Sequence, residues 1–220
     1  MAGCCDPRGC DRIFGTRFAR RSAARYRRRG LDDESRRIVA WLEQQGIRDA
    51  SVLEIGGGVG AIQVELLKRG AARATNLELS PAYDSEGWAL AAEAGVADRI
   101  TRQLGDIAVD DAVAPVHDFV VLNRVVCCYP DHARLLAAAA RHARRGVVFS
   151  HPPRSLLTVA LIGVENVALR LVRREYQTFA HPPDQMRAVL RSSGFEDVVV
   201  DAGRVWTVMA ASPSHQRVAP

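Results

Sequence analysis

The sequence predicts an α/β protein built on a doubly wound, mostly parallel sheet, and three observations favour this class. A short apolar segment, residues 51–55, is followed by a glycine-rich turn and by a segment with helical spacing that ends at Gly70. Strand-like and helix-like segments then alternate as far as Gly194. Residues 195–203 and 204–212 alternate apolar and polar side chains, which predicts a closing antiparallel hairpin.

Composition limits the class of protein further. A chain of 220 residues with 48% hydrophobic content is long enough for one α/β domain with a substantial core. No apolar run approaches the roughly 18 to 20 residues of a membrane span, and the N-terminus lacks the apolar core of a signal peptide. The five cysteines include two adjacent pairs and do not suggest a secreted disulfide framework. We therefore expect a cytoplasmic protein with no transmembrane segment.

The first 30 residues are strongly basic, with nine Arg against two Asp. An amphipathic helix is predicted here from the helical spacing of Phe14, Phe18, Ala19, Ser22 and Tyr26. Such basicity suits nucleic acid or anionic lipid, but no nucleic-acid recognition pattern is present, so a solvated basic helix is favoured over a nucleic-acid partner. A second helix, capped by Asp32 or Asp33, completes an N-terminal helical cap over residues 1–50.

The turn after the first strand has the spacing Gly56-x-Gly58-x-Gly60, and Glu54 precedes it. Glycine is needed where backbone approaches a ligand closely or adopts positive φ, and the N-terminus of the next helix offers unpaired N–H groups. The spacing is one residue shorter than the dinucleotide fingerprint. A nucleotide-like cofactor is therefore expected, with a purely structural turn as the alternative.

Two further acidic residues follow predicted strands. Glu78 lies near the end of the second strand, 18 residues beyond Gly60, and Asp106 ends the third. In a doubly wound sheet, ligands bind at the C-terminal edges of the strands, where an acid can accept hydrogen bonds from both ribose hydroxyls. A single carboxylate of this kind is more often a solvated loop residue. The succession of the glycine turn, Glu78 and Asp106, each at a strand end, nevertheless favours a cofactor site.

This order resembles the class I S-adenosylmethionine (SAM)-dependent methyltransferases over roughly residues 14–210. The resemblance implies a Rossmann-like, seven-stranded sheet, SAM as cofactor, and a lid role for the N-terminal helices, although simple packing of those helices against the sheet is equally open. The resemblance implies that Gly56, Gly58 and Gly60, with Glu54 beside them, hold the methionine and ribose portions of SAM. It implies that the end of the second strand, Glu78 and Leu79, binds the ribose, and that the end of the third, Asp106 and Ile107, binds adenine. The backbone of Asn123 is implied to bind the methionine amino group.

The loop after the fourth strand, residues 123–130, departs from family patterns. It carries Cys127-Cys128-Tyr129 where many small-molecule methyltransferases have a histidine pair, and it lacks the Asn/Asp-Pro-Pro-Tyr/Phe signature of enzymes that act on nucleobases or protein glutamine. Asp131 is predicted to cap a helix that runs to Arg145. This loop is expected to face the acceptor.

Two histidines follow later strand and helix boundaries. His151 comes just past the fifth strand, and His181 precedes the last helix. Because imidazole titrates near neutral pH, either could remove a proton, although capping or hydrogen bonding is the more frequent role for a single histidine. The residues proposed to bind or activate the acceptor are Cys127, Cys128, Tyr129, His151 and His181.

A strongly apolar helix over residues 155–175 is inserted after the fifth strand. Its apolar side chains run nearly all round, so it could contact a greasy substrate, a second subunit in a homodimer, a membrane surface or the core. The segment from this helix to Phe195 distantly resembles the magnesium-protoporphyrin and ubiquinone methyltransferase branches. We assign residues 51–212 to the SAM-binding domain and 213–220 to a flexible tail.

The sequence thus predicts a SAM-dependent methyltransferase acting on a small, partly apolar metabolite, with no metal site. One alternative is a metalloid or thiol methyltransferase that uses a cluster of Cys4, Cys5, Cys10, Cys127 and Cys128, because thiolates favour soft metals. Another alternative is a non-catalytic SAM-binding or nucleic-acid-associated protein.

Overall fold

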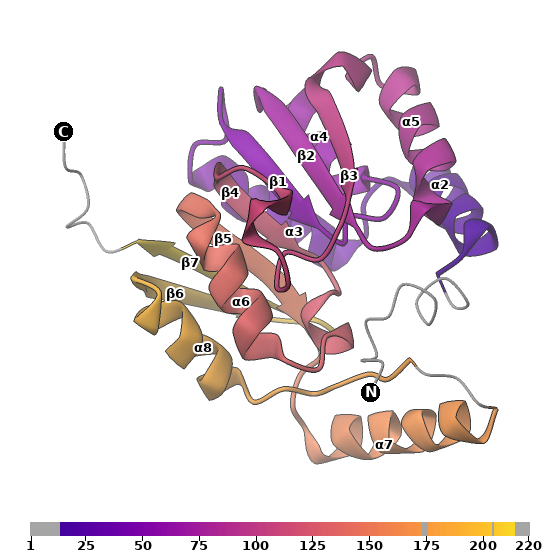
Figure 1. Ribbon diagram of the computed structural model, residues 1–220, viewed down its shortest axis with the longest axis vertical. Helices are drawn as coiled ribbons and strands as arrows, with labels where there is room; N and C mark the ends of the chain where they lie inside the picture. Colours follow the sequence, from indigo (N-terminus) through magenta and orange to yellow (C-terminus); the bar gives the residue numbers. More distant parts are fainter. Residues whose placement is uncertain (1–13, 173–175, 204, 214–220) are drawn as a thin grey trace.

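A computed structural model of the protein describes residues 14–172, 176–203 and 205–213. Its centre is a seven-stranded sheet in the order β3-β2-β1-β4-β5-β7-β6 (Figure 1). The strands from β1 to β5 pair in parallel, whereas β7 is antiparallel to both β5 and β6. The predicted fold class is therefore confirmed. The strands are β1 Ser51–Ile55, β2 Arg73–Glu78, β3 Ile100–Leu104, β4 His117–Leu122, β5 Ala143–His151, β6 Phe195–Ala202 and β7 Thr207–Pro213.

Helices alternate with the strands and cover both faces of the sheet. Side chains at the helix starts accept hydrogen bonds from exposed backbone N–H groups, as Asp32 does from Ser35 N and Asp131 from Arg134 N. The helices are α2 Thr16–Arg29, α3 Asp33–Gln44, α4 Ala61–Lys68, α5 Asp84–Glu93, α6 His132–Arg141, α7 Leu156–Leu171 and α8 Pro183–Ser192. Short 3-10 helices are formed by Pro81–Tyr83, Ala97–Arg99, Asp111–Val113 and Val126–Cys128.

The core has two layers because successive strand residues point to opposite faces of the sheet. On one face, Leu53 and Val120 pack with residues of α6 and α8, such as Leu136. On the other face, Val52 and Phe119 pack with residues of α3, α4 and α5. Within a parallel sheet both faces are buried, which explains the nearly continuous apolar runs of the central strands.

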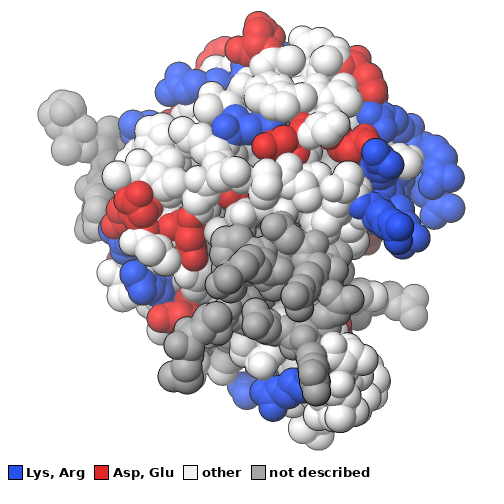
Figure 2. Space-filling model, turned by 45° about the vertical axis from the view of Figure 1, so that its right-hand side comes forward, with Lys and Arg blue, Asp and Glu red and all other residues white. Residues whose placement is uncertain are grey.

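Helix α2 lies beside the C-terminal edge of the sheet rather than on either face. Its buried Ala19 and Ala23 pack against Val59, Tyr83 and Leu90. The outer part of the helix is basic, and Figure 2 shows this cluster of Lys and Arg on the side of the molecule that α2 occupies. Some of the charge is paired, since Arg27 contacts Glu86 and Glu93.

Two predicted helix ends were wrong. Helix α6 stops at Arg141 rather than Arg145, because the ring of His142 bonds to the carbonyls of Ala138 and Asp111 and the chain then enters β5. The inserted helix α7 ends at Leu171 and is 16 residues long. Residues 1–13 of the predicted cap and residues 214–220 of the predicted tail lie outside the described residues. Within the described part of the chain, no helix is both long and apolar enough to cross a membrane.

Candidate active site

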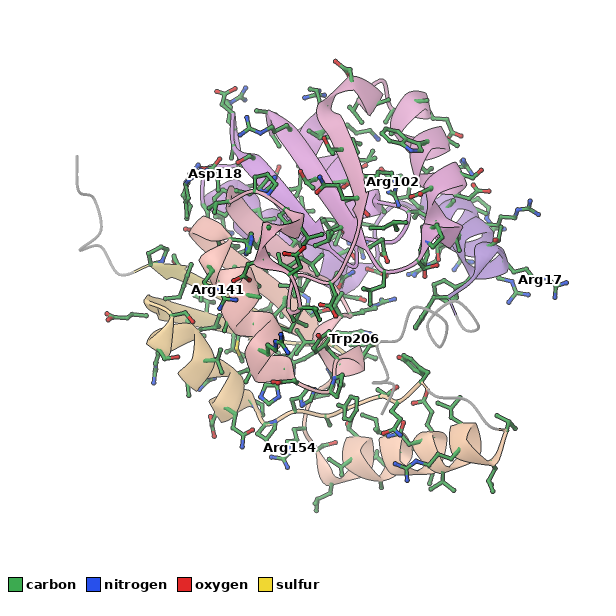
Figure 3. The ribbon with its side chains drawn as sticks, viewed as in Figure 1. Arg17, Arg102, Asp118, Arg141, Arg154 and Trp206 are labelled. Carbon is green, nitrogen blue, oxygen red and sulfur yellow. The ribbon has the colours of Figure 1, made fainter. Side chains whose placement is uncertain are left out.

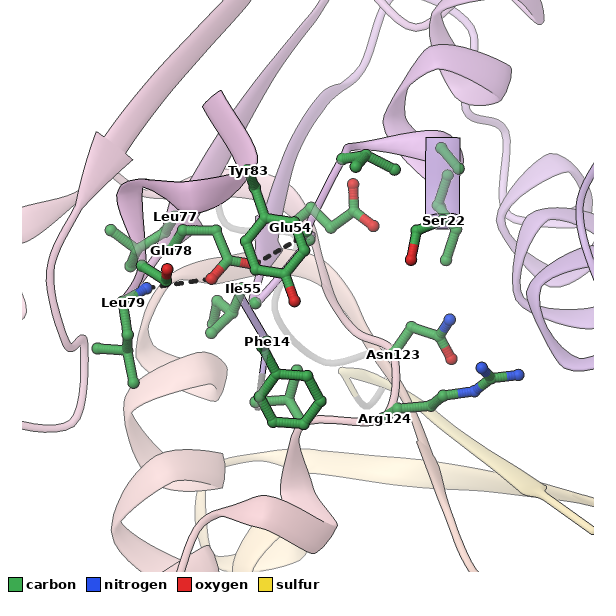
Figure 4. Close-up of a pocket in the computed structure, with 18 of the residues that line it drawn as sticks. Phe14, Ser22, Glu54, Ile55, Leu77, Glu78, Leu79, Tyr83, Asn123 and Arg124 are labelled. Atoms are coloured by element: carbon green, nitrogen blue, oxygen red, sulfur yellow. Dashed lines mark hydrogen bonds between the residues drawn. The ribbon is translucent and has the colours of Figure 1, made fainter. Parts of the chain in front are cut away.

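A cavity of about 310 Å³ lies at the C-terminal edges of β1 to β4. The glycine turn, the ends of β2 and β3, the loop after β4 and one side of α2 line it. Figure 4 shows Glu78 and Leu79 on one side of this space and Asn123 and Arg124 on the opposite side. The site therefore forms where the sequence places it, at the edge where the parallel strands end.

The glycine turn has a backbone that only glycine adopts easily. Gly56, Gly58 and Gly60 have φ of +61°, +56° and +78°. A Cβ on Gly56 would lie 2.5 Å from a methyl carbon of Val125, so a side chain there would also collide with the loop after β4. The turn thus brings bare backbone to the cavity wall.

Glu78 faces this turn from the end of β2. Its carboxylate accepts hydrogen bonds from Gly58 N, at 2.5 Å, and from Leu79 N, at 3.1 Å. Burial raises the pKa of Glu78, and these backbone donors and the nearby Arg102 oppose that rise. Arg102 in turn donates to the carbonyl of Gly58, so the turn is held from both its N–H and its C=O sides.

Glu54, in β1, is buried beneath the same turn. It accepts a hydrogen bond of 3.2 Å from Gln63 N in the first turn of α4. Burial raises the pKa of Glu54 to about 8, and the neighbouring Glu78 carboxylate acts in the same direction. The Glu78 carboxylate is thus close enough to disfavour the charged form of Glu54.

Asp106 lines the cavity after the end of β3. One oxygen accepts from Ala108 N and the other from the Tyr129 hydroxyl, each at 2.9 Å. Ile107 and Tyr129 also line the wall. The loops after β3 and β4 are therefore joined beside an apolar surface.

Asn123 links the loop after β4 to α3 and β5. Its amide nitrogen donates to Ser35 Oγ at 3.1 Å, and its amide oxygen accepts from Ser150 Oγ at 2.7 Å. The Arg124 N–H also donates to Ser150 Oγ, at 2.8 Å. The side chain of Asn123 is thus committed to positioning this loop.

Arg124 is a part of the cavity wall that sequence reasoning missed. It has a positive φ of 60°, which is uncommon outside glycine, and its guanidinium forms ion pairs with Asp32, at 2.7 Å, and with Glu34. It also lies over the ring of Trp206, with 5.2 Å from guanidinium carbon to ring centroid. No pattern in the sequence connects residues 32 and 124, because only the fold brings them together.

The two adjacent cysteines have different surroundings. Cys128 lines the cavity, and its sulfur lies 2.9 Å from the Tyr176 hydroxyl. Cys127 is buried behind it, with 3.6 Å between the two sulfurs, and both the Cys128 thiol and burial raise the pKa of Cys127. Within the described ranges, no group of three or more His, Cys, Asp or Glu could hold a metal ion. The predicted partners Cys4, Cys5 and Cys10 lie outside those ranges.

The two candidate histidines lie behind the wall rather than on it. His151 is the last residue of β5, is buried, and donates from Nδ1 to the carbonyl of Pro152. His181 donates from Nε2 to the carbonyl of Tyr129 and stacks between His132 and Phe179. Burial lowers the pKa of both His151 and His181. Of the five predicted acceptor residues, Cys128 and Tyr129 thus line the cavity, whereas Cys127, His151 and His181 do not.

The comparisons with known proteins point to one family. A methyltransferase-domain family model matches residues 23–200, whereas no curated protein matches the sequence. Magnesium protoporphyrin IX methyltransferase from Synechocystis PCC 6803, solved with bound SAH, is 19% identical, with 82% of each chain covered and a TM-score of 0.66. An O-methyltransferase family protein from Burkholderia thailandensis is 16% identical over 82% of this chain and 56% of that chain, with a TM-score of 0.66.

A putative sarcosine dimethylglycine methyltransferase from Galdieria sulphuraria is 14% identical over 82% of this chain and 85% of that chain, with a TM-score of 0.64. At such identities these likenesses show a common fold. The family model itself extends from α2 to β6 and so takes in the glycine turn and every strand end around the cavity. On this evidence the chain belongs to the SAM-dependent class I methyltransferases.

Proposed function

We propose that the protein transfers a methyl group from SAM to a small, partly apolar acceptor in the cavity below α2. The observation that carries this proposal is the buried Glu78 carboxylate, which is hydrogen-bonded directly to the positive-φ glycine turn at the cavity wall. A carboxylate at this strand end has acceptor sites left for a ribose diol after it binds Gly58 N and Leu79 N.

The remaining walls fit the other parts of SAM. Leu79 and Ile107 offer apolar surface for adenine, and Asp106 offers a carboxylate for its amino group. The bare backbone of the glycine turn allows close approach of the methionine portion, with Glu54 supporting the turn from below. The backbone of Asn123 is proposed to bind the amino group of the methionine portion, because the Asn123 side chain is occupied elsewhere.

The acceptor is proposed to lie on the α2 side of the cavity. Phe14, Phe18 and Tyr26 line that side, and aromatic rings favour a ligand with apolar surface. Bound SAM supplies an electrophilic methyl group, so the protein has mainly to orient the acceptor and exclude water. Cys128 and Tyr129 are proposed to contact the acceptor, whereas Cys127, His151 and His181 hold the wall in place.

Binding of S-adenosylhomocysteine (SAH) and transfer of an isotopically labelled methyl group test this proposal together. Calorimetry should show binding near micromolar affinity, about −8 kcal/mol. Incubation with labelled SAM and a metabolite extract should label a small molecule rather than protein or nucleic acid. If neither SAM nor SAH gives a binding heat or protects against thermal unfolding, the cofactor assignment fails. If binding occurs but only macromolecules are labelled, the acceptor assignment fails.

A further inference from the structure

Helix α7 exposes an unusual amount of apolar surface. None of its 16 residues is buried, and Leu156, Leu161 and Val164 are 93%, 61% and 70% exposed. Half of the exposed large hydrophobic side chains in the described part of the chain lie between residues 156 and 172. Monomeric soluble proteins rarely expose contiguous apolar patches of this extent without a binding role.

One stripe of the helix, which includes Asn166, faces the protein, and most of the Leu and Val side chains point outward. Among the described residues of α7, four are partly buried and the rest are exposed. The four are Thr158, Ile162, Asn166 and Leu169, and their spacing puts them on one stripe. Within that stripe the Asn166 amide donates to the carbonyl of Thr178, at 2.8 Å, and accepts from Thr178 N, at 2.9 Å. This paired hydrogen bond fixes which face of α7 points away from the body.

The outward face is broader than one helix partner can cover. At about 100° per residue, the exposed Leu and Val side chains of α7 occupy an arc of roughly 200°. A helix that packs on a protein core or on another helix typically buries a stripe little wider than about 100°. A fluid apolar phase can cover the whole arc, because it has no fixed shape to match.

Positive charge accompanies this apolar face. The exposed Arg154 and Arg170 lie close to the two ends of α7. Helix α2 adds exposed Arg17, Arg21 and Arg28, which share one face by their spacing and form no ion pair with a described carboxylate. Figure 3 shows Arg17 pointing away from the body.

The two helices lie on the same side of the molecule. The ring of Phe14, just before α2, contacts the ring of Tyr176, after α7, with 5.3 Å between centroids. Figure 2 shows the basic cluster of α2 and the white surface of α7 in a single view of this side. Exposed apolar and cationic side chains therefore occur on the same side of the molecule.

We propose that α7 and the arginine face of α2 form a docking surface for an anionic lipid bilayer. Exposed Leu and Val of α7 enter the boundary between headgroups and acyl chains, and the arginines contact anionic headgroups. Stable attachment usually needs two such contributions, apolar insertion and basic charge, and the structure supplies both. The inference concerns lipid binding and does not depend on methyl transfer.

Flotation with phosphatidylcholine vesicles, with and without phosphatidylglycerol, tests the surface on the full chain. We expect binding that requires phosphatidylglycerol and weakens as salt is raised. The variant Leu161→Glu/Val164→Glu should lower binding by more than about tenfold through loss of apolar insertion. Arg17→Glu/Arg21→Glu should lower binding to anionic vesicles by at least about fivefold per arginine. The matched control, Val199→Glu/Arg191→Glu, alters exposed residues of β6 and α8 and should bind as the unchanged protein does.

Four results would overturn the proposal. The first is no flotation with either vesicle, and the second is flotation that the α7 variant leaves intact. The third is a protein that is a dimer in size-exclusion chromatography, becomes a monomer in the α7 variant, and binds vesicles in neither form. The surface would then join two copies of the chain. The fourth is arginine-dependent binding of single-stranded RNA without vesicle binding, which would assign α2 to nucleic acid. Circular dichroism of each variant confirms that the fold is retained.

Discussion

The hydroxyl of Tyr129 donates a hydrogen bond of 2.9 Å to the carboxylate of Asp106 and so joins two loops around the proposed cofactor site. Tyr129 belongs to the loop after β4, and Asp106 to the loop after β3. The bond fixes the carboxylate oxygen that the Ala108 N–H does not hold. The geometry of the proposed adenine end therefore depends on Tyr129, a residue that we propose contacts the acceptor.

This relationship predicts coupling between the two residues. Tyr129→Phe should weaken SAH binding by about 1 kcal/mol, because the carboxylate loses a positioning hydrogen bond. In an Asp106→Ala background the same change should cost almost nothing. Calorimetry on the four proteins gives the coupling energy directly. Equal costs in both backgrounds would show that Tyr129 acts independently of Asp106.

Removal of the Glu78 carboxylate should have a larger effect. Glu78→Ala should weaken SAH binding by roughly 1 to 3 kcal/mol, since charge-assisted hydrogen bonds to the ligand would be lost. Glu196→Ala, an exposed substitution in β6, is the control and should bind SAH normally. Calorimetric titration decides, and unchanged affinity in Glu78→Ala would remove this residue from the site.

Glu54 should make stability fall between about pH 4.5 and pH 8. Its folded pKa of about 8 lies above the ordinary value of 4.5, so its contribution to stability is fully present below about pH 4.5 and is lost as pH rises through about 8. Glu54→Gln keeps the acceptor for Gln63 N and cannot ionise. It should therefore raise the free energy of unfolding at pH 8 by at least about 1 kcal/mol.

Urea denaturation over a pH series measures this effect, with Glu196→Gln as the exposed control. The difference between Glu54→Gln and the unchanged protein should grow with pH. A difference that stays constant across the series would mean that Glu54 is ionised in the folded protein throughout.

His151 should act in the opposite direction. Burial holds its folded pKa below the ordinary 6.5, so its contribution is fully present above about pH 6.5 and is lost as pH falls through the folded pKa. His151→Asn can still donate to the carbonyl of Pro152 but does not titrate. Thermal unfolding below pH 6.5 should then depend less steeply on pH than in the unchanged protein. An identical pH slope would show that other groups, such as the buried His117, cause the acid loss.

The adjacent cysteines should differ in reactivity. Cys127 is buried and its thiol pKa is raised, so it should react with iodoacetamide at least about tenfold more slowly than Cys128 on the cavity wall. SAH should slow alkylation of Cys128 if the two share the cavity. Mass spectrometry of peptides from a timed reaction assigns each site. Faster alkylation of Cys127 would show that Cys127, and not Cys128, is the cysteine exposed to the cavity.

The sequence alone determined the order of elements and the edge at which the site forms. Parallel strands end at one edge, so the glycine turn, Glu78 and Asp106 had to meet there once the strands were recognised. The periodicity of α2 also predicted an amphipathic helix with Ala19 on its inner stripe, although it included the exposed Phe18 and missed the buried Ala23. These features are local, because each depends on residues within one strand, turn or helix.

Tertiary structure decided what depends on contacts between distant segments. Arg124 meets Asp32 and Glu34 only because the fold places the end of β4 beside the start of α3. Cys128 faces the cavity and Cys127 does not, because adjacent residues of the 3-10 helix Val126–Cys128 point about 120° apart. The apolar pattern of α7 fits a core helix equally well, and only the Asn166 hydrogen bonds to Thr178 turn that face outward. Spacing shows which side chains share a face, but the partner of that face is set by packing across the whole fold.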